Sequence, residues 1–226
     1  SLESVVQVTG PVAANEKAPG GFEIKAETTE VLAAAAHDLP ISVNAEHGQI
    51  GLETLLEKRT LSLRNPAVRG IFEVQAVIID AFSEYLRAHG FTEIKTSKLI
   101  GTGTEGGTGL FEVEYFDRKV YLAQSPQFYK QVMVASGMER VFEIGAAYRA
   151  EKHETPRHLN EYISLDVEMG FIESEIDLIE FERTLVQHII DRVRRDCARQ
   201  VKALGATLPG QDEMSAAPIL PYDDAK

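Results

Sequence analysis

The sequence predicts an α+β fold, in which an antiparallel sheet is flanked by helices and preceded by the end of a small β-barrel. Two observations predict this class. Apolar and polar residues alternate, as in strands, through most of residues 1–32. From residue 66 onward, a helix, several strands and a second long helix follow in that order. Strands grouped between helices, rather than alternating with them, are typical of an α+β fold.

The first segment has the pattern of a β-hairpin. In its second half Phe22 and Ile24 alternate with Glu23 and Lys25, and a turn is expected at residues 18–21, Ala-Pro-Gly-Gly. Two strands are rarely stable alone, so the segment is expected to be the end of a barrel that begins elsewhere. Residues 33–65 are polar with few periodic features, and we interpret them as a connector.

A helix is expected to begin at Asn65 and Pro66, because asparagine suits the cap position and proline the first turn. Apolar residues follow at helical spacing until Gly90, which ends the helix. The elements expected next are a strand at 91–100, a glycine-rich mobile loop at 101–109, a hairpin at 111–123 turning at Asp117–Arg118, and a short helix from Pro126 to about Ser136.

Two further strands are expected at residues 140–151 and 161–171, on either side of a polar loop at 152–160. A long helix should span residues 174–204, because its first turn is acidic and its last turns are basic, as the helix dipole favours. Residues 206–226 contain proline and glycine and are interpreted as a linker.

Composition excludes some classes of protein. The 226 residues contain no apolar run of membrane-spanning length and no basic-then-apolar N-terminus, so we expect a cytoplasmic protein that binds no membrane. The net charge of −12 argues against non-specific nucleic-acid binding but leaves a local RNA-binding patch open. The single cysteine, Cys197, rules out an internal disulfide and is expected in the core, and no metal ligands are assigned.

Charged side chains that could take part in chemistry are concentrated in residues 149–171. Side-chain alternation places Arg149 and Glu151 on one face of the first strand, and Asp166 and Glu168 on one face of the second. Cations grouped around a hairpin suit a triphosphate, and the carboxylates suit a metal ion or an ammonium group. A solvated hairpin with surface ion pairs is the alternative that these residues alone leave open.

This pattern of Arg-x-Glu, a variable loop, Arg-His and Asp-x-Glu resembles motif 2 of the class II aminoacyl-tRNA synthetases. The resemblance implies that Arg149 holds the α-phosphate of ATP and the amino-acid carboxylate, and that Asp166 helps to hold the α-ammonium. The other roles implied are Glu151 near the adenine, Arg157 and His158 at the ATP phosphates, and Lys152, His153, Glu154 and Thr155 at the acceptor end of tRNA.

A second segment, residues 124–131 or QSPQFYKQ, resembles the matching stretch of aspartyl-tRNA synthetases. A helix start there would expose Ser125 and Gln127 as hydrogen-bonding groups, and Lys130 would offer a compact positive charge. An aspartate side chain needs such a charge, whereas asparagine would leave a buried ammonium without its counter-charge, at a cost of several kcal/mol by order of magnitude. The alternative is a surface lysine on an amphipathic helix.

Residues 104–107, Thr-Glu-Gly-Gly, resemble the loop that in this family closes over the substrate's ammonium with its glutamate, which implies that role for Glu105. A flexible linker is the usual reading of such a loop. Residues 66–100 resemble motif 1, which builds the dimer interface, and therefore imply a homodimer. Ser97 departs from the family, which normally has proline there, and so leaves the exact interface packing open.

The family's motif 3 has no match in residues 170–226. The resemblance therefore implies three segments: residues 1–36 as the end of an OB-type anticodon-binding barrel, 37–65 as a hinge, and 66–226 as the first part of a class II catalytic domain. The fragment alone is expected to be inactive, because its ATP site lacks a wall.

The implied function is that of an aspartate–tRNA ligase, which uses L-aspartate, ATP, Mg²⁺ and tRNA(Asp). Pro19 stands in a turn where discriminating archaeal-type enzymes commonly carry a lysine, so a second hypothesis is that tRNA(Asn) is charged too. An ordinary hairpin turn is the alternative for Pro19. Rival functions are an asparaginyl-tRNA synthetase, a synthetase-derived enzyme that forms asparagine, and a non-catalytic tRNA-binding module.

Overall fold

The computed structural model describes residues 3–36, 39–46, 48–104, 109–153, 155, 158–221 and 223. The chain divides into two compact units, Ser1–Asn65 and Pro66–Lys226, which are described separately. The assignment of residues 1–36 and 37–65 to an anticodon-binding barrel and a hinge stays a prediction.

The first unit contains four short antiparallel strands where the sequence predicts two longer ones. They are β1 (Val5–Thr9), β2 (Val12–Ala14), β3 (Phe22–Ile24) and β4 (Thr28–Ala33), with β1 paired to β4 and β2 to β3. Each predicted strand is interrupted where the two approach each other. A Cβ on Gly10 would lie 1.9 Å from the carbonyl oxygen of Lys25, so this close approach requires glycine. The predicted turn is present, and Gly20 has a φ of 85° that favours glycine.

The segment interpreted as a connector also contains two short helices, α1 (Leu52–Glu57) and α2 (Arg59–Ser62). The Ser62 hydroxyl is buried and donates to the carbonyl oxygen of Leu55 at 2.7 Å. This contact joins the two helices, which are too short for an apolar period to predict them.

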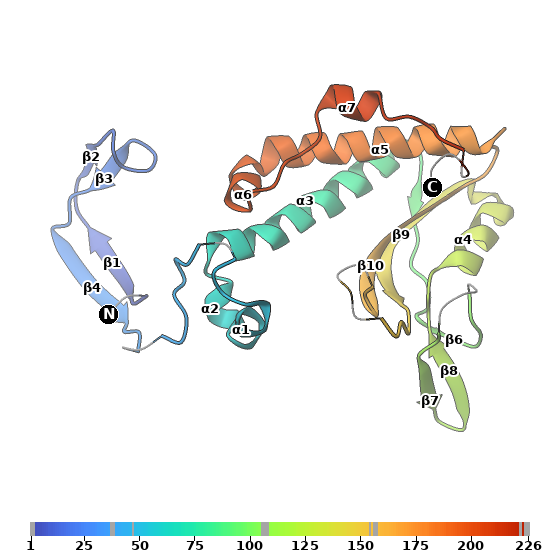
Figure 1. Ribbon diagram of the computed structural model, residues 1–226, viewed down its shortest axis with the longest axis horizontal. Helices are drawn as coiled ribbons and strands as arrows, with labels where there is room; N and C mark the ends of the chain where they lie inside the picture. The colour runs from blue at the N-terminus through green and yellow to red at the C-terminus, as the bar shows by residue number, and fades with distance from the viewer. Residues whose placement is uncertain are drawn as a thin grey trace. The chain divides into compact units, whose positions relative to one another are not determined.

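The second unit is built on a sheet whose middle strand is β9. The strand order is β10–β9–β5, with β10 (Glu161–Met169) antiparallel and β5 (Thr92–Glu93) parallel to β9 (Arg140–Tyr148). Two long helices, α3 (Pro66–Ala88) and α5 (Glu175–Asp196), pack against each other beside this sheet (Figure 1). The predicted order of helix, strands and helix is therefore confirmed.

The hydrophobic core lies between these helices and one face of the sheet. Phe142 of β9 is 1% exposed and meets Phe82 of α3 edge to face, with ring centroids 5.8 Å apart. Leu86, Phe91 and Leu185 complete the buried cluster. Burying each such side chain contributes about 1.5–3 kcal/mol, so this cluster fixes the sheet against the helices.

The remaining elements extend from this frame. They are β6 (Leu99–Ile100), β7 (Glu112–Tyr115), β8 (Arg118–Leu122), α4 (Gln127–Met133), the π-helix η1 (Val134–Met138), α6 (Ala198–Ala203) and α7 (Gln211–Ser215). The strands β6, β8 and β7 form a second antiparallel sheet in that order. The predicted strand at 91–100 is thus two short strands, β5 and β6, which belong to different sheets and are separated by residues 94–98.

The long C-terminal helix ends earlier than predicted, because Cys197 leaves helical geometry with a φ of −122°. Cys197 is buried as expected, and burial raises the pKa of its thiol. No described helix is both long enough and apolar enough to cross a membrane.

Candidate functional site

The two faces of the β9–β10 ribbon differ sharply in chemistry. Residues directly opposite each other share a face, and the register pairs Glu143 with Asp166 and Tyr162 with Ala147. The face opposite the core carries, in register order, Val141, Glu143, Gly145 and Ala147 of β9, and Glu168, Asp166, Ser164 and Tyr162 of β10. We call this the polar face.

Lys130 of α4 reaches the polar face and contacts both of its predicted carboxylates. Its Nζ donates to Asp166 Oδ1 at 3.0 Å and lies 3.5 Å from Glu168 Oε2. The second oxygen of Asp166 accepts from the Ser164 hydroxyl at 2.5 Å. Lys130 is 9% exposed, so it is a buried, oriented charge rather than a surface lysine.

The helix that carries Lys130 begins in the buried segment predicted from residues 124–131. Gln124 and Ser125 are 1% and 6% exposed. The Ser125 hydroxyl accepts from the backbone N–H of Gln127 at 3.2 Å, which satisfies one of the donors at the helix start. The predicted helix is confirmed, and it packs against the β9–β10 ribbon.

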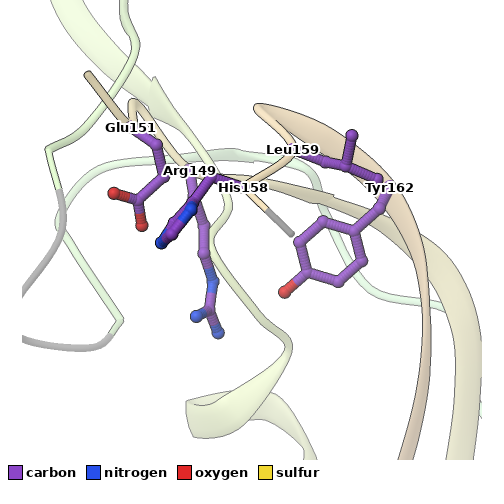
Figure 2. A pocket seen from close by; sticks show the side chains of 5 residues that line it. All are labelled: Arg149, Glu151, His158, Leu159 and Tyr162. Carbon is purple, nitrogen blue, oxygen red and sulfur yellow. The ribbon is translucent and has the colours of Figure 1, made fainter. Parts of the chain in front are cut away.

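A pocket of about 500 Å³ lies near the other end of the polar face (Figure 2). It is lined by Arg149, Glu151, His158, Leu159 and Tyr162. The Arg149 guanidinium lies 5.9 Å from the centre of the Tyr162 ring, and the backbone N–H of Arg149 donates to the carbonyl oxygen of Asn160 at 2.9 Å. The pocket therefore combines a fixed cation with an aromatic wall, a combination that suits a nucleotide phosphate and base.

Small side chains separate the two charged regions. Gly145, Ala147 and Ser164 lie between the Lys130 contacts and Arg149 along the ribbon. Asp166 and Tyr162 are four residues apart on β10, about 13 Å at 3.3 Å per residue. The polar face thus offers an anion-binding group at each end and a low floor between them, which suits an elongated ligand with two negative groups.

The loop between β9 and β10 holds the residues predicted to meet the outer phosphates and the acceptor end of tRNA. His158 and Thr155 are exposed, and the Thr155 hydroxyl lies 2.6 Å from His158 Nδ1. Lys152 and His153 are exposed too. The predicted residues Glu105, Glu154 and Arg157 lie outside the described residues.

Three residues of this region were not identified from the sequence. Tyr162 forms the aromatic wall of the pocket, and Glu143 and Lys98 form an ion pair beside Asp166, with Lys98 Nζ 3.1 Å from Glu143 Oε1. The strand register is the signal that could have found Glu143, which is directly opposite Asp166. Alternation along the strand is the signal for Tyr162, which is four residues from Asp166 and shares its face. Lys98 gives no such signal, because the segment that carries it is irregular.

The side chains of the described residues do not form a site that could hold a metal ion. They include no group of three or more His, Cys, Asp or Glu placed to hold one. Asp166 and Glu168, the carboxylates with the most suitable chemistry, both contact Lys130.

Residues 51–226 match the family described as tRNA synthetases class II (D, K and N). The chain is 48% identical over 207 residues to an aspartate–tRNA(Asp/Asn) ligase of Deinococcus radiodurans, a match that covers 92% of this chain and 47% of the relative. A protein of the same name from Methanopyrus kandleri is 47% identical over 207 residues, with 92% and 48% covered.

Among solved structures, asparaginyl-tRNA synthetase from Pyrococcus horikoshii complexed with asparaginyl-adenylate superposes with a TM-score of 0.87 at 34% identity. The superposition covers 99% of this chain and 50% of that one. The chain thus spans about half the length of the curated relatives it matches.

Proposed function

This chain belongs to the class II tRNA synthetases (D, K and N), and we propose that its full-length protein is an aspartate–tRNA ligase. In this proposal the polar face binds L-aspartate and ATP and forms aspartyl-adenylate. The relatives named aspartate–tRNA ligases support the proposal, and the single observation that carries it is the position of Lys130.

Lys130 favours aspartate over asparagine because its charge is buried and oriented. An ammonium has three N–H donors, and here one makes a well-formed hydrogen bond, to Asp166. Its other two contacts, with the Val167 carbonyl oxygen at 3.4 Å and with Glu168 at 3.5 Å, are longer than a good hydrogen bond. Donor capacity therefore remains for a substrate carboxylate, whereas an asparagine amide would bring no charge to this ammonium.

Arg149 takes the other end of the ligand. An aspartate α-carboxylate oxygen attacks the α-phosphorus of ATP, and the bond to the bridging oxygen of pyrophosphate breaks. Arg149 would orient both groups and stabilise the charge that develops on the α-phosphate. Glu151 near the adenine, and His158 with Arg157 at the outer phosphates, complete the proposed ATP site. The family's closing loop would add Glu105 at the substrate's ammonium.

Magnesium, when bound with ATP, neutralises phosphate charge. The described residues do not form a protein cage for it, so we assign it no ligand and no step.

In the second step the terminal ribose hydroxyl of tRNA attacks the aspartyl carbonyl carbon, and AMP leaves. The loop residues Lys152, His153, Glu154 and Thr155 are proposed to meet the acceptor end. We also propose a cytoplasmic homodimer whose interface includes residues 66–100, and acceptance of tRNA(Asn) beside tRNA(Asp). The names of the two relatives, which include both tRNAs, support the last point.

An asparagine-activating enzyme is the second candidate, favoured by the close superposition on an asparaginyl-tRNA synthetase. ATP–pyrophosphate exchange by the full-length protein decides between the two. Exchange that depends on aspartate and not on asparagine supports the proposal. Exchange driven by asparagine would show that Lys130 is misinterpreted, and no exchange with either would favour a non-catalytic module.

A further inference from the structure

A buried carboxylate lies next to the Lys130 contacts and takes no part in the proposed chemistry. Glu143 is 3% exposed, although it lies on the polar face. Its Oε1 accepts from the backbone N–H of Thr96 at 3.0 Å and forms an ion pair with Lys98 Nζ at 3.1 Å, and its Oε2 accepts from the Thr96 hydroxyl at 2.7 Å. Lys98 Nζ donates to that hydroxyl at 3.2 Å, which closes a ring of contacts.

A second carboxylate, that of Asp166, lies next to this ring of contacts. Glu143 is directly opposite Asp166 in the β9–β10 register. Like charges directly opposite each other destabilise a sheet unless each is neutralised. Lys98 neutralises Glu143 and Lys130 neutralises Asp166, so each carboxylate has its own ammonium from a different segment of the chain.

Counting formal charges shows how closely the region is balanced. Three carboxylates, Glu143, Asp166 and Glu168, face two lysines, Lys98 and Lys130. Loss of Lys98 would leave Lys130 to serve all three carboxylates. The electrostatic potential would then become more negative where the proposed aspartate carboxylate must bind.

Lys98 is also joined to the Lys130 segment through the backbone. Its carbonyl oxygen accepts from the N–H of Ala123 at 3.0 Å, and the Ala123 carbonyl oxygen accepts from the N–H of Tyr148 at 2.9 Å. Residues 124–130 follow at once, so the start of the Lys130 segment is held between Lys98 and the end of β9. A shift of Lys98 would move that segment as well as its charge.

We propose that Lys98 and Glu143 are positioning residues that set the specificity of the aspartate subsite. Glu143 fixes residues 96–98 to β9, and Lys98 neutralises Glu143 so that the Lys130 ammonium stays available to the substrate carboxylate. This inference rests on the proposed function. It adds a second lysine that the site needs in order to accept a negatively charged amino acid.

The test measures pyrophosphate exchange by full-length wild type, Lys98→Met, Glu143→Gln and the double variant, with aspartate and with ATP varied in turn. Lys98→Met should raise the KM for aspartate about 10- to 100-fold, because a buried carboxylate is left unpaired beside the subsite. The KM for ATP should change by less than about twofold, since Arg149 lies six residues from Glu143 along the strand, about 20 Å.

The double variant replaces the ion pair by a neutral pair of similar shape. It should return the KM for aspartate to within about threefold of wild type, because charge balance is restored and the two effects are not additive. A purely structural pair would instead lower the melting temperature in every variant without this recovery. Lys119→Met is the matched control, since Lys119 forms an exposed ion pair with Glu112 on the β7–β8 hairpin, and it should leave both KM values unchanged.

The outcomes separate the two proposals. A wild-type protein without aspartate-dependent exchange would overturn the proposed function and this inference with it. A wild type active with aspartate, but with a Lys98→Met variant whose KM for aspartate is unchanged or rises in parallel with that for ATP, would overturn this inference alone. Failure of the double variant to recover would also overturn it.

Discussion

At the scale of single residues, two arginines of this chain have similar surroundings and very different expected roles. Arg149 lies 5.9 Å from the Tyr162 ring centre in the pocket on the polar face. Arg118 lies 5.5 Å from the Tyr115 ring centre on the β7–β8 hairpin. Comparing variants of Arg149 and Arg118 therefore separates the effect on activity of losing a site residue from that of losing any arginine–tyrosine contact.

Arg149→Ala in the full-length protein is expected to reduce aspartate-dependent exchange by about 10²–10³-fold, the usual cost of losing one group that stabilises the transition state. Arg149→Lys should remain impaired, because an ammonium cannot reproduce the planar fork of the guanidinium. Arg118→Ala should stay within about twofold of wild type. Equal losses in the Arg118 and Arg149 variants would contradict the role given to Arg149.

The sequence alone predicts which charged residues belong to the candidate site, but not which of them contact one another. Lys130 was predicted from its segment, and the shared face of Asp166 and Glu168 from strand alternation. Their contact with each other was not predicted, because it joins a helix to a strand 36 positions later in the chain. Distances of this kind depend on how α4 packs on the ribbon, which no local pattern encodes.

At the scale of elements, the polar face depends on glycine where β9 passes the Lys98 segment. A Cβ on Gly145 would lie 3.1 Å from Lys98 Nζ and 3.2 Å from Glu143 Oε1. Gly145→Ala should therefore displace the Lys98 ammonium without removing any charge, and raise the KM for aspartate about five- to tenfold, an effect of roughly 1 kcal/mol.

Exchange kinetics check this expectation, with Gly51→Ala as the matched control. A Cβ on Gly51 would have no atom within 4 Å, so the control should behave as wild type. A Gly145→Ala variant with an unchanged KM for aspartate would show that the Lys98 position tolerates displacement.

The end of α5 carries a carboxyl whose pKa is strongly lowered. Asp196 is flanked by Arg195 and Arg192, whose hydrogen bonds lower the pKa of its carboxyl to about 2 from an ordinary value of 3.8. A carboxylate at a helix C-terminus opposes the helix dipole, so the arginines also offset an unfavourable position. Arg192 further contacts Glu84 and so connects α5 to α3.

Because the folded-state pKa of Asp196 is lowered, its contribution to stability is present above the unfolded pKa. It is lost as the pH falls from about 4 to about 2. Asp196→Asn should therefore melt at a lower temperature than wild type at neutral pH, and the difference should shrink toward pH 2. A difference in melting temperature that stays constant across this range would exclude the carboxylate as its source.

Long, strongly periodic elements, the short helix α4 and the β7–β8 hairpin could be predicted, whereas the other short helices could not. Helix α3 begins and ends where its cap and apolar spacing indicate. The break at Cys197 could not be predicted, because the residues on both sides continue a helical pattern. The short helices α1, α2 and α7 similarly lack the length that makes a period visible.

At the scale of the whole molecule, a net charge of −12 must be reconciled with the polyanionic tRNA proposed as the partner. In that proposal, recognition of tRNA depends on local contacts rather than on a general basic surface. Pro19 is exposed in the turn before β3 and offers neither a charge nor an N–H donor. This turn is where discrimination between tRNA(Asp) and tRNA(Asn) is expected to be decided.

The wild-type full-length protein should aspartylate both tRNAs, and Pro19→Lys should lower charging of tRNA(Asn) relative to tRNA(Asp) by about tenfold, an effect of about 1.4 kcal/mol. The ratio of kcat/KM for the two tRNAs is the quantity to compare, with Ala18→Lys as a control for added charge. A wild type that rejects tRNA(Asn) would contradict the hypothesis directly.

In the proposed function, one face of the β9–β10 ribbon binds aspartate at Lys130 and the α-phosphate at Arg149. A crystal structure of the full-length protein with a non-hydrolysable aspartyl-adenylate analogue is the most direct test. We expect the ligand's side-chain carboxylate at Lys130 Nζ and the phosphate mimic at the Arg149 guanidinium. An analogue bound away from this face, or with its carboxylate on another cation while Lys130 contacts only Asp166 and Glu168, would contradict it.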